Sequence, residues 1–84
     1  MMQLLYAKRV EKDLRKLPPA VQSRIIAKLE FYATQKDPLE FAELLANHPL
    51  GDLRFRVGDY RILCDLEQDT LLVTAIGNRR DIYR

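Results

Sequence analysis

The chain has 84 residues, of which 48% are hydrophobic and 31% are charged, and its formal net charge is +2. This length predicts one folded domain, spanning residues 1–84, with a modest hydrophobic core. A net charge so close to zero excludes a uniformly basic nucleic-acid-binding chain, so any affinity for a polyanion requires a local basic patch.

The first half of the chain predicts one strand followed by two helices. Residues 3–7 are a short apolar segment that is typical of a strand. Apolar residues then recur at helical spacing through residues 8–17 and again through residues 20–35. Pro18 and Pro19 separate the two helices, because proline cannot continue a helix but fits its first turn. We therefore expect a helical hairpin with one apolar side.

A proline also ends the second predicted helix, at Pro38. The apolar residues within 39–46 predict a short third helix after it. The polar residues 47–52 then form a loop that leads into the next predicted element.

Residues 53–64 predict a β-hairpin. Apolar and basic residues alternate strictly before Gly58-Asp59, and this period of two is typical of a half-buried strand. Gly-Asp fits a two-residue hairpin turn, because glycine supplies the positive φ that the turn needs. The resulting register pairs Val57 with Tyr60, Arg56 with Arg61, Phe55 with Ile62, Arg54 with Leu63 and Leu53 with Cys64.

This register places Arg54, Arg56 and Arg61 on the face of the hairpin opposite the apolar core. Like charges that lie directly opposite each other destabilise a sheet, so acidic side chains or an anionic partner should offset them. Two interpretations remain open: a solvated face with ion pairs, and a phosphate site that uses the bidentate geometry of arginine. For Arg61 the ion-pair alternative names Asp59, Asp65 or Asp81.

The nearly continuous apolar run at residues 70–76 predicts a central strand that is buried on both faces. The order of elements is then one strand, two or three helices and a three-stranded antiparallel meander. We expect an α+β fold in which a four-stranded sheet carries its helices on one face. The basic face is left uncovered, and Arg79, Arg80 and Tyr83 are expected to reach it after the last strand.

Residue usage excludes two further classes of protein. No apolar run approaches the roughly 20 residues of a membrane-spanning helix, and the first six residues lack the features of a signal peptide. One cysteine and one histidine are too few for a usual zinc site. We expect a cytoplasmic protein that uses no metal or cofactor, with Cys64 packed in the core.

Two stretches together resemble the RelE/ParE superfamily of toxins from bacterial and archaeal toxin–antitoxin pairs. They are Leu-Arg-Phe-Arg-Val-Gly-Asp-Tyr-Arg-Ile at residues 53–62 and Ile-Gly-Asn-Arg-Arg-Asp-Ile-Tyr-Arg at residues 76–84. The first strand and a first helix ending in Lys-Leu-Pro also fit, so the resemblance covers nearly the whole chain.

The resemblance implies a small ribonuclease-like fold that is toxic when free and is neutralised by a cognate antitoxin. The RelE branch cleaves messenger RNA in the ribosomal A site, with contacts to ribosomal RNA, whereas the ParE branch inhibits DNA gyrase without nuclease activity. A third alternative is a degenerate member that only binds its antitoxin. We expect the first of these activities, with the other two as alternatives.

The resemblance also implies roles for individual residues. Arg61 matches the arginine that stabilises the scissile phosphate. Arg79 matches the arginine that acts as an acid or as a charge stabiliser near the leaving group. Tyr83 matches the tyrosine that activates the 2′-hydroxyl or stacks on a base. Three further arginines are expected to bind RNA on the same surface: Arg54, Arg56 and Arg80.

Asn78 departs from the family pattern, because many relatives carry histidine there. Asparagine donates a hydrogen bond but cannot act as a base near neutral pH. His48 is the chain's only imidazole, but an ordinary surface position in a proline-containing loop is the favoured interpretation over a general base.

Overall fold

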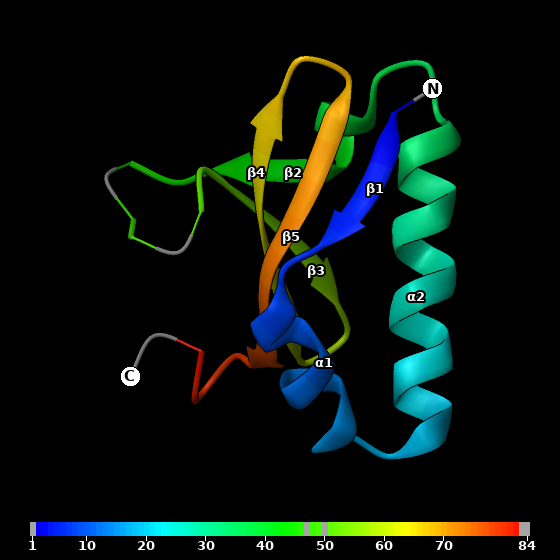
Figure 1. The fold of residues 1–84 in the computed structure, drawn as a ribbon, viewed down its shortest axis with the longest axis vertical. Helices are drawn as coiled ribbons and strands as arrows, with labels where there is room; N and C mark the ends of the chain where they lie inside the picture. Colours follow the sequence, from blue (N-terminus) through cyan, green and yellow to red (C-terminus); the bar gives the residue numbers. More distant parts are fainter. Residues whose placement is uncertain (1, 47, 50, 83–84) are drawn as a thin grey trace.

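In the computed structural model, which describes residues 2–46, 48–49 and 51–82, a five-stranded sheet packs against two helices (Figure 1). The elements are β1 (Gln3–Tyr6), α1 (Lys8–Arg15), α2 (Pro19–Thr34), the short 3₁₀ helix η1 (Pro38–Phe41), β2 (Ala42–Leu44), β3 (Leu53–Val57), β4 (Tyr60–Glu67) and β5 (Thr70–Asn78). The strand order is β1-β5-β4-β3-β2. Strand β1 is parallel to β5, and the other neighbours are antiparallel. The predicted α+β class is confirmed.

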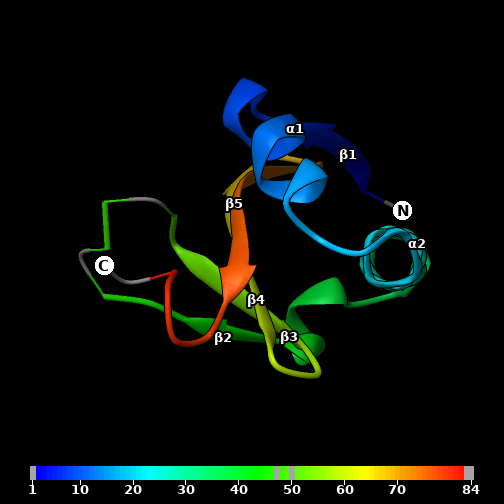
Figure 2. The same ribbon diagram turned by 90° about the horizontal axis from the view of Figure 1, so that it is seen from below.

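The main core lies between α2 and one face of the sheet. Figure 2 shows α2 on one side of the twisted sheet and the C-terminal segment on the other. Ile25 and Leu29 of α2 are fully buried, and the ring of Tyr32 stacks on that of Phe55 at a centroid distance of 5.0 Å. Cys64 is also fully buried in this core, as expected.

Helix α1 completes the edge of β5 where β1 ends. The pairing of β1 with β5 stops at Tyr6 and Val73, so the N–H of Ile76 has no strand partner on that edge. The carboxylate of Asp13 accepts a hydrogen bond from Ile76 N at 3.0 Å and binds Arg9 Nε at 3.2 Å. A side chain of α1 thus replaces the missing strand, which fixes the helix against the sheet.

The prediction of a third helix over residues 39–46 is wrong for its second half. The 3₁₀ helix η1 ends at Phe41, and residues 42–44 form the edge strand β2, which raises the sheet from the expected four strands to five. The free edge of β3 decides this outcome, because pairing with it satisfies backbone groups and places Glu43 opposite Arg54.

Strand β5 is an interior strand, as its apolar run predicts, and it extends two residues beyond the expected end at Ile76. A bulge lies where β4 pairs with it: Leu63 opposes Ala75, but Cys64 opposes Val73. Thr74 is the extra residue, and its hydroxyl donates to the carbonyl of Leu63 at 3.0 Å. The bulge brings Val73 and Ile76, which are three residues apart, into the same buried cluster.

Candidate nucleic-acid interface

The β3–β4 hairpin places three arginines on the face of the sheet opposite α2. Its register pairs Arg56 with Arg61 and Arg54 with Leu63, which confirms the register predicted from the alternation. Gly58 adopts a φ of 58° at the turn, a conformation that glycine adopts without steric cost. Arg56 and Arg61 therefore extend from directly opposed positions on one face.

Two of these arginines share one carboxylate from β2. Glu43 lies opposite Arg54, and its Oε2 accepts a short hydrogen bond from Arg54 Nη2. Its other oxygen lies 2.8 Å from Nε of Arg56. The hydrogen bond from Arg54 is the main reason that the pKa of the Glu43 carboxyl is lowered from its usual value. For Arg54 and Arg56, the offsetting group is therefore an acidic side chain.

Arg61 is held by backbone carbonyls instead. Its Nη1 donates to the carbonyl of Gly58 at 2.9 Å and to that of Tyr60 at 3.1 Å. Within residues 2–46, 48–49 and 51–82, no ion pair joins Arg61 to a carboxylate, so the predicted ion-pair alternative is not found there. Asp65, one of the named candidates, accepts a hydrogen bond from the backbone of Asp52 instead. Arg61 is thus fixed in position without a direct ion pair in the described residues, although the charge of Glu43 acts on it over a longer distance.

The C-terminal turn starts beside the same hairpin tip. The backbone N–H of Arg79 donates to the carbonyl of Asp59 at 2.8 Å. The side-chain oxygen of Asn78 accepts a hydrogen bond from Arg80 N at 3.0 Å. The backbone carbonyl of Asn78 accepts one from Ile82 N at the same distance. Asn78 thus closes the turn. The residue has a structural role at the position where many members of the family carry histidine.

The basic face is partly covered, contrary to the expectation of an open surface. Leu63, Ala75 and Ile82 are buried together on this side of the sheet, with Leu45 packed against them. Gly77 permits the close approach, since a Cβ there would lie 3.1 Å from Cδ1 of Ile82. The sheet thus carries a second small core, and the cationic groups lie around it.

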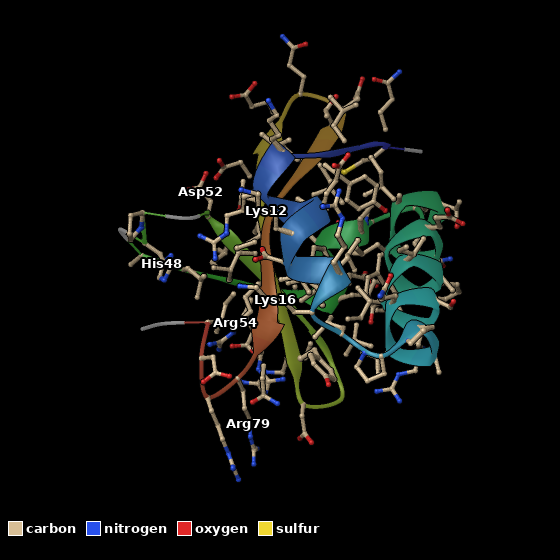
Figure 3. All side chains as sticks on the ribbon, turned by 60° about the horizontal axis from the view of Figure 1, so that its bottom comes forward. Lys12, Lys16, His48, Asp52, Arg54 and Arg79 are labelled. Carbon is tan, nitrogen blue, oxygen red and sulfur yellow. The ribbon has the colours of Figure 1, made fainter. Side chains whose placement is uncertain are left out.

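Arg79 and Arg80 are exposed residues of this turn. Figure 3 shows the side chain of Arg79 pointing outward at the lower end of the molecule, away from Arg54. The structure therefore brings the backbone of Arg79 to the hairpin tip but does not direct its guanidinium toward Arg54. Tyr83 lies outside the described residues.

Cysteine chemistry is not supported at this surface. Burial raises the pKa of the Cys64 thiol to about 12, so the reactive thiolate is not formed near neutral pH. His48 lies on the loop between β2 and β3.

The described part of the chain has neither a metal-binding cluster nor a membrane-spanning helix. Its residues include no group of three His, Cys, Asp or Glu side chains that is placed to hold a metal ion. None of its helices has both the length and the apolar character needed to cross a bilayer.

A pocket of about 470 Å³ lies between α1, the end of β5 and the C-terminal turn. Its charged lining residues are Arg9, Lys16, Asp13 and Asp81. Because two cations face two anions, and Asp13 already binds Ile76 N and Arg9, this pocket has no net preference for an anionic chain.

Glu43 is the residue of the site that sequence reasoning missed. Residues 39–46 were expected to be helical, which hid the pairing of Glu43 with Arg54 across two strands. The positive charge of the three hairpin arginines indicated that a carboxylate should lie nearby, but it did not identify which one.

A sheet backed by helices, with arginines from β3 and β4 beside a C-terminal turn, defines a small two-layer α+β domain of the RelE type. The toxin–antitoxin complex RelBE2 from Mycobacterium tuberculosis contains a chain of this fold. It matches with a TM-score of 0.76 and 22% identity, covering 93% of this chain and 98% of that one.

Sequence comparison gives the family. The family model described as ParE toxin of type II toxin-antitoxin system, parDE, matches residues 4–83. Toxin RelG from Mycobacterium tuberculosis is 32% identical over 75 residues, which cover 87% of this chain and 85% of that protein. Toxin RelE3 from Methanocaldococcus jannaschii is 29% identical, over 98% of this chain and 96% of that protein. The chain belongs to the RelE/ParE superfamily of type II toxin–antitoxin toxins.

Proposed function

We propose that this toxin is a ribosome-dependent endonuclease that cleaves messenger RNA at a phosphate held by Arg61. One observation carries the proposal: Arg61 is fixed by the carbonyls of Gly58 and Tyr60, and no carboxylate in the described residues forms an ion pair with it. The similarity to proteins named RelG and RelE3 supports the RelE activity over the other activities of the superfamily.

In the proposed reaction the ribose 2′-oxygen forms a bond to the adjacent phosphorus, and the bond from phosphorus to the 5′-oxygen breaks. A water molecule takes the proton of the 2′-hydroxyl, and another gives a proton to the departing 5′-oxygen. Negative charge builds on the non-bridging oxygens, where a fixed guanidinium lowers the barrier, and one such contact is typically worth about 2.7–4 kcal/mol. The chemistry is confined to RNA, because DNA lacks the 2′-hydroxyl.

The other catalytic residues of the proposal are Arg79 and Tyr83. Arg79 begins the C-terminal turn and its backbone N–H anchors that turn to the hairpin tip, so its exposed side chain can turn back toward a bound strand. A guanidinium stays charged at neutral pH, so Arg79 acts on the leaving oxygen through its charge. Tyr83 is assigned to the 2′-hydroxyl or to base stacking by the resemblance alone.

The proposed RNA-binding residues are Arg54, Arg56 and Arg80. Arg54 and Arg56 both pair with Glu43, and messenger or ribosomal RNA would compete with Glu43 for these guanidinium groups. Arg80 is exposed beside Arg79 and adds a positive charge.

The proposed protein partner is a cognate antitoxin, because the RelBE2 toxin–antitoxin complex contains a chain of this fold. An acidic segment that folds on binding fits the arginine face, where it would compete with RNA for the same guanidinium groups. Hydrogen exchange of the complex tests this: protection is expected over β3 and β4 or over the two helices, and protection of neither contradicts it.

Cleavage of messenger RNA on programmed ribosomes tests the proposed activity. The wild-type protein should cut within the A-site codon, and Arg61→Ala and Arg79→Ala should each abolish cutting while the fold is kept. Arg15→Ala is the matched control, because Arg15 lies on α1 and pairs only with Glu11 in the described structure. Intact message with folded, growth-arresting protein would contradict the proposal.

Inhibition of DNA gyrase is the second candidate, because the family model that matches the chain is the ParE one. That activity predicts DNA breaks and an SOS response without message cleavage. Absence of growth arrest when the protein is induced without antitoxin would instead identify a member that only binds its antitoxin.

A further inference from the structure

The tip of the β3–β4 hairpin meets a fourth arginine, which comes from α2. Figure 1 shows this turn beside the lower half of α2. Gly58 has no side chain, and a Cβ at this position would lie 2.3 Å from Nη2 of Arg24. The guanidinium of Arg24 therefore occupies the space that a side chain at position 58 would fill.

Arg24 and Arg61 converge on this one glycine from different elements. Arg61 donates to the carbonyl of Gly58, and Arg24 lies over its Cα. No ion pair or hydrogen bond from a described residue neutralises Arg24, and the nearby side chain of Asp59 binds neither arginine. Arg24 is an exposed residue of a helix whose buried side is formed by Ile25 and Leu29.

Two guanidinium groups at one turn repel each other unless an anion lies between or beside them. On β3, Glu43 pairs directly with two arginines. In the described structure no carboxylate forms an ion pair with Arg24 or Arg61, and Glu43 acts on Arg61 over a longer distance. A phosphate group suits the position, because guanidinium donors bind its oxygens in charge-assisted pairs. The backbone carbonyls that hold Arg61 leave its charge available to such a group.

We propose that Arg24 is a phosphate-binding residue of the RNA site, contacting the strand next to the phosphate at Arg61; this rests on the proposed function. Arg24 positions the strand and takes no part in bond breaking. The site thus extends from the sheet face across the hairpin tip to α2. Single-stranded RNA is the occupant that we assign, and an acidic segment of the antitoxin is the competing one.

Binding of a labelled, fully 2′-O-methylated RNA strand to the full-length protein tests this, because such a strand cannot be cleaved. Fluorescence anisotropy over a salt series gives the affinity and its salt dependence. For Arg24→Gln we expect roughly tenfold weaker binding at low salt and a log–log salt slope reduced by about 0.7, the value for one phosphate contact in a single strand. Arg24→Lys should recover most of the slope, because it restores the charge.

Lys28→Gln is the matched control, because it removes one positive charge from the same helix, where Lys28 lies over the ring of Phe31. It should leave the slope unchanged. If Arg24→Gln does not fold, Gly58→Asn provides the second variant, since asparagine tolerates positive φ and its side chain displaces Arg24. The same loss of slope is expected from it.

Equal affinities and slopes for wild type, Arg24→Gln and Lys28→Gln would overturn the proposal, as would a wild-type protein without affinity for the strand. Unchanged RNA binding with weakened antitoxin binding would overturn it in favour of the protein partner. The outcome is separate from that of the cleavage assay. If Arg24→Gln changes the salt slope but the wild-type protein does not cleave message on ribosomes, the Arg24 site stands and the nuclease activity is refuted. If the protein cleaves message but Arg24→Gln leaves the slope unchanged, the nuclease activity stands and the Arg24 site is refuted.

Discussion

Two regions of the same basic face treat their arginines differently. On β3, Arg54 and Arg56 share the carboxylate of Glu43. At the hairpin tip, Arg61 donates to two backbone carbonyls and has no ion pair with any described residue. Residue type and strand position are nearly the same in the two regions, so direct pairing with a carboxylate is what separates them. The paired region links β2 to β3, and the tip is where we propose an anionic ligand.

The largest expected effect is that of Arg61→Ala on cleavage. Removing a fixed donor from developing negative charge typically lowers a rate by about 10²–10³-fold. Ribosomal cleavage rates measure this, and the melting temperature should hardly change, because only two hydrogen bonds to carbonyls at the hairpin tip are lost, one exposed and one part-buried. A variant with a much lower melting temperature but a wild-type cleavage rate would contradict this. Arg61 would then have a structural role, like that of Arg54 in its pair with Glu43.

The next effect is that of Glu43→Gln on RNA affinity. The substitution removes the charge that offsets Arg54 and Arg56, so we expect several-fold tighter binding of the uncleavable strand and a steeper salt dependence. Glu40→Gln is a suitable control, because Glu40 is an exposed acidic residue of η1 with no ion pair in the described structure. Equal affinities of Glu43→Gln and Glu40→Gln for the RNA strand would contradict this. They would show that Glu43 does not limit RNA binding by Arg54 and Arg56.

A smaller effect concerns pH. The pKa of the Glu43 carboxyl is lowered from its usual 4.5, mainly by the hydrogen bond from Arg54. The ion pairs therefore contribute stability above that value, and the contribution is lost as the pH falls through the lower pKa of the folded state. Urea unfolding of wild type and Glu43→Gln should show a stability difference at neutral pH that shrinks in acid. A difference that stays constant from neutral pH into strong acid would contradict this.

The smallest effect is expected for Arg15→Ala. Its ion pair with Glu11 joins two side chains that are 74% and 72% exposed, and such pairs contribute roughly 0–1 kcal/mol. Stability and cleavage should both stay near wild type. A strong loss of cleavage here would extend the functional surface onto α1 and weaken the contrast between the two regions of the sheet.

The hairpin was predictable because its information is local. Alternation sets the faces, and Gly58-Asp59 sets the register, so the pairing of Arg56 with Arg61 follows from sequence alone. The long apolar run at residues 70–76 likewise identified an interior strand.

The remaining features depend on contacts between distant segments. Strand β2 forms because the edge of β3 is free, which overrides the helical pattern of residues 39–46. Ile82 covers part of the basic face through a turn that Asn78 closes. The approach of Arg24 to Gly58 depends on where α2 lies relative to the hairpin, which no local pattern encodes.

Side-chain NMR of the arginine Nε–H groups during titration with the uncleavable RNA strand tests the central contrast most directly. We expect the largest shifts at Arg61 and Arg24, with smaller shifts at Arg54 and Arg56, which keep their bonds to Glu43. Large shifts at Arg54 and Arg56 with an unchanged signal from Arg61 would contradict it.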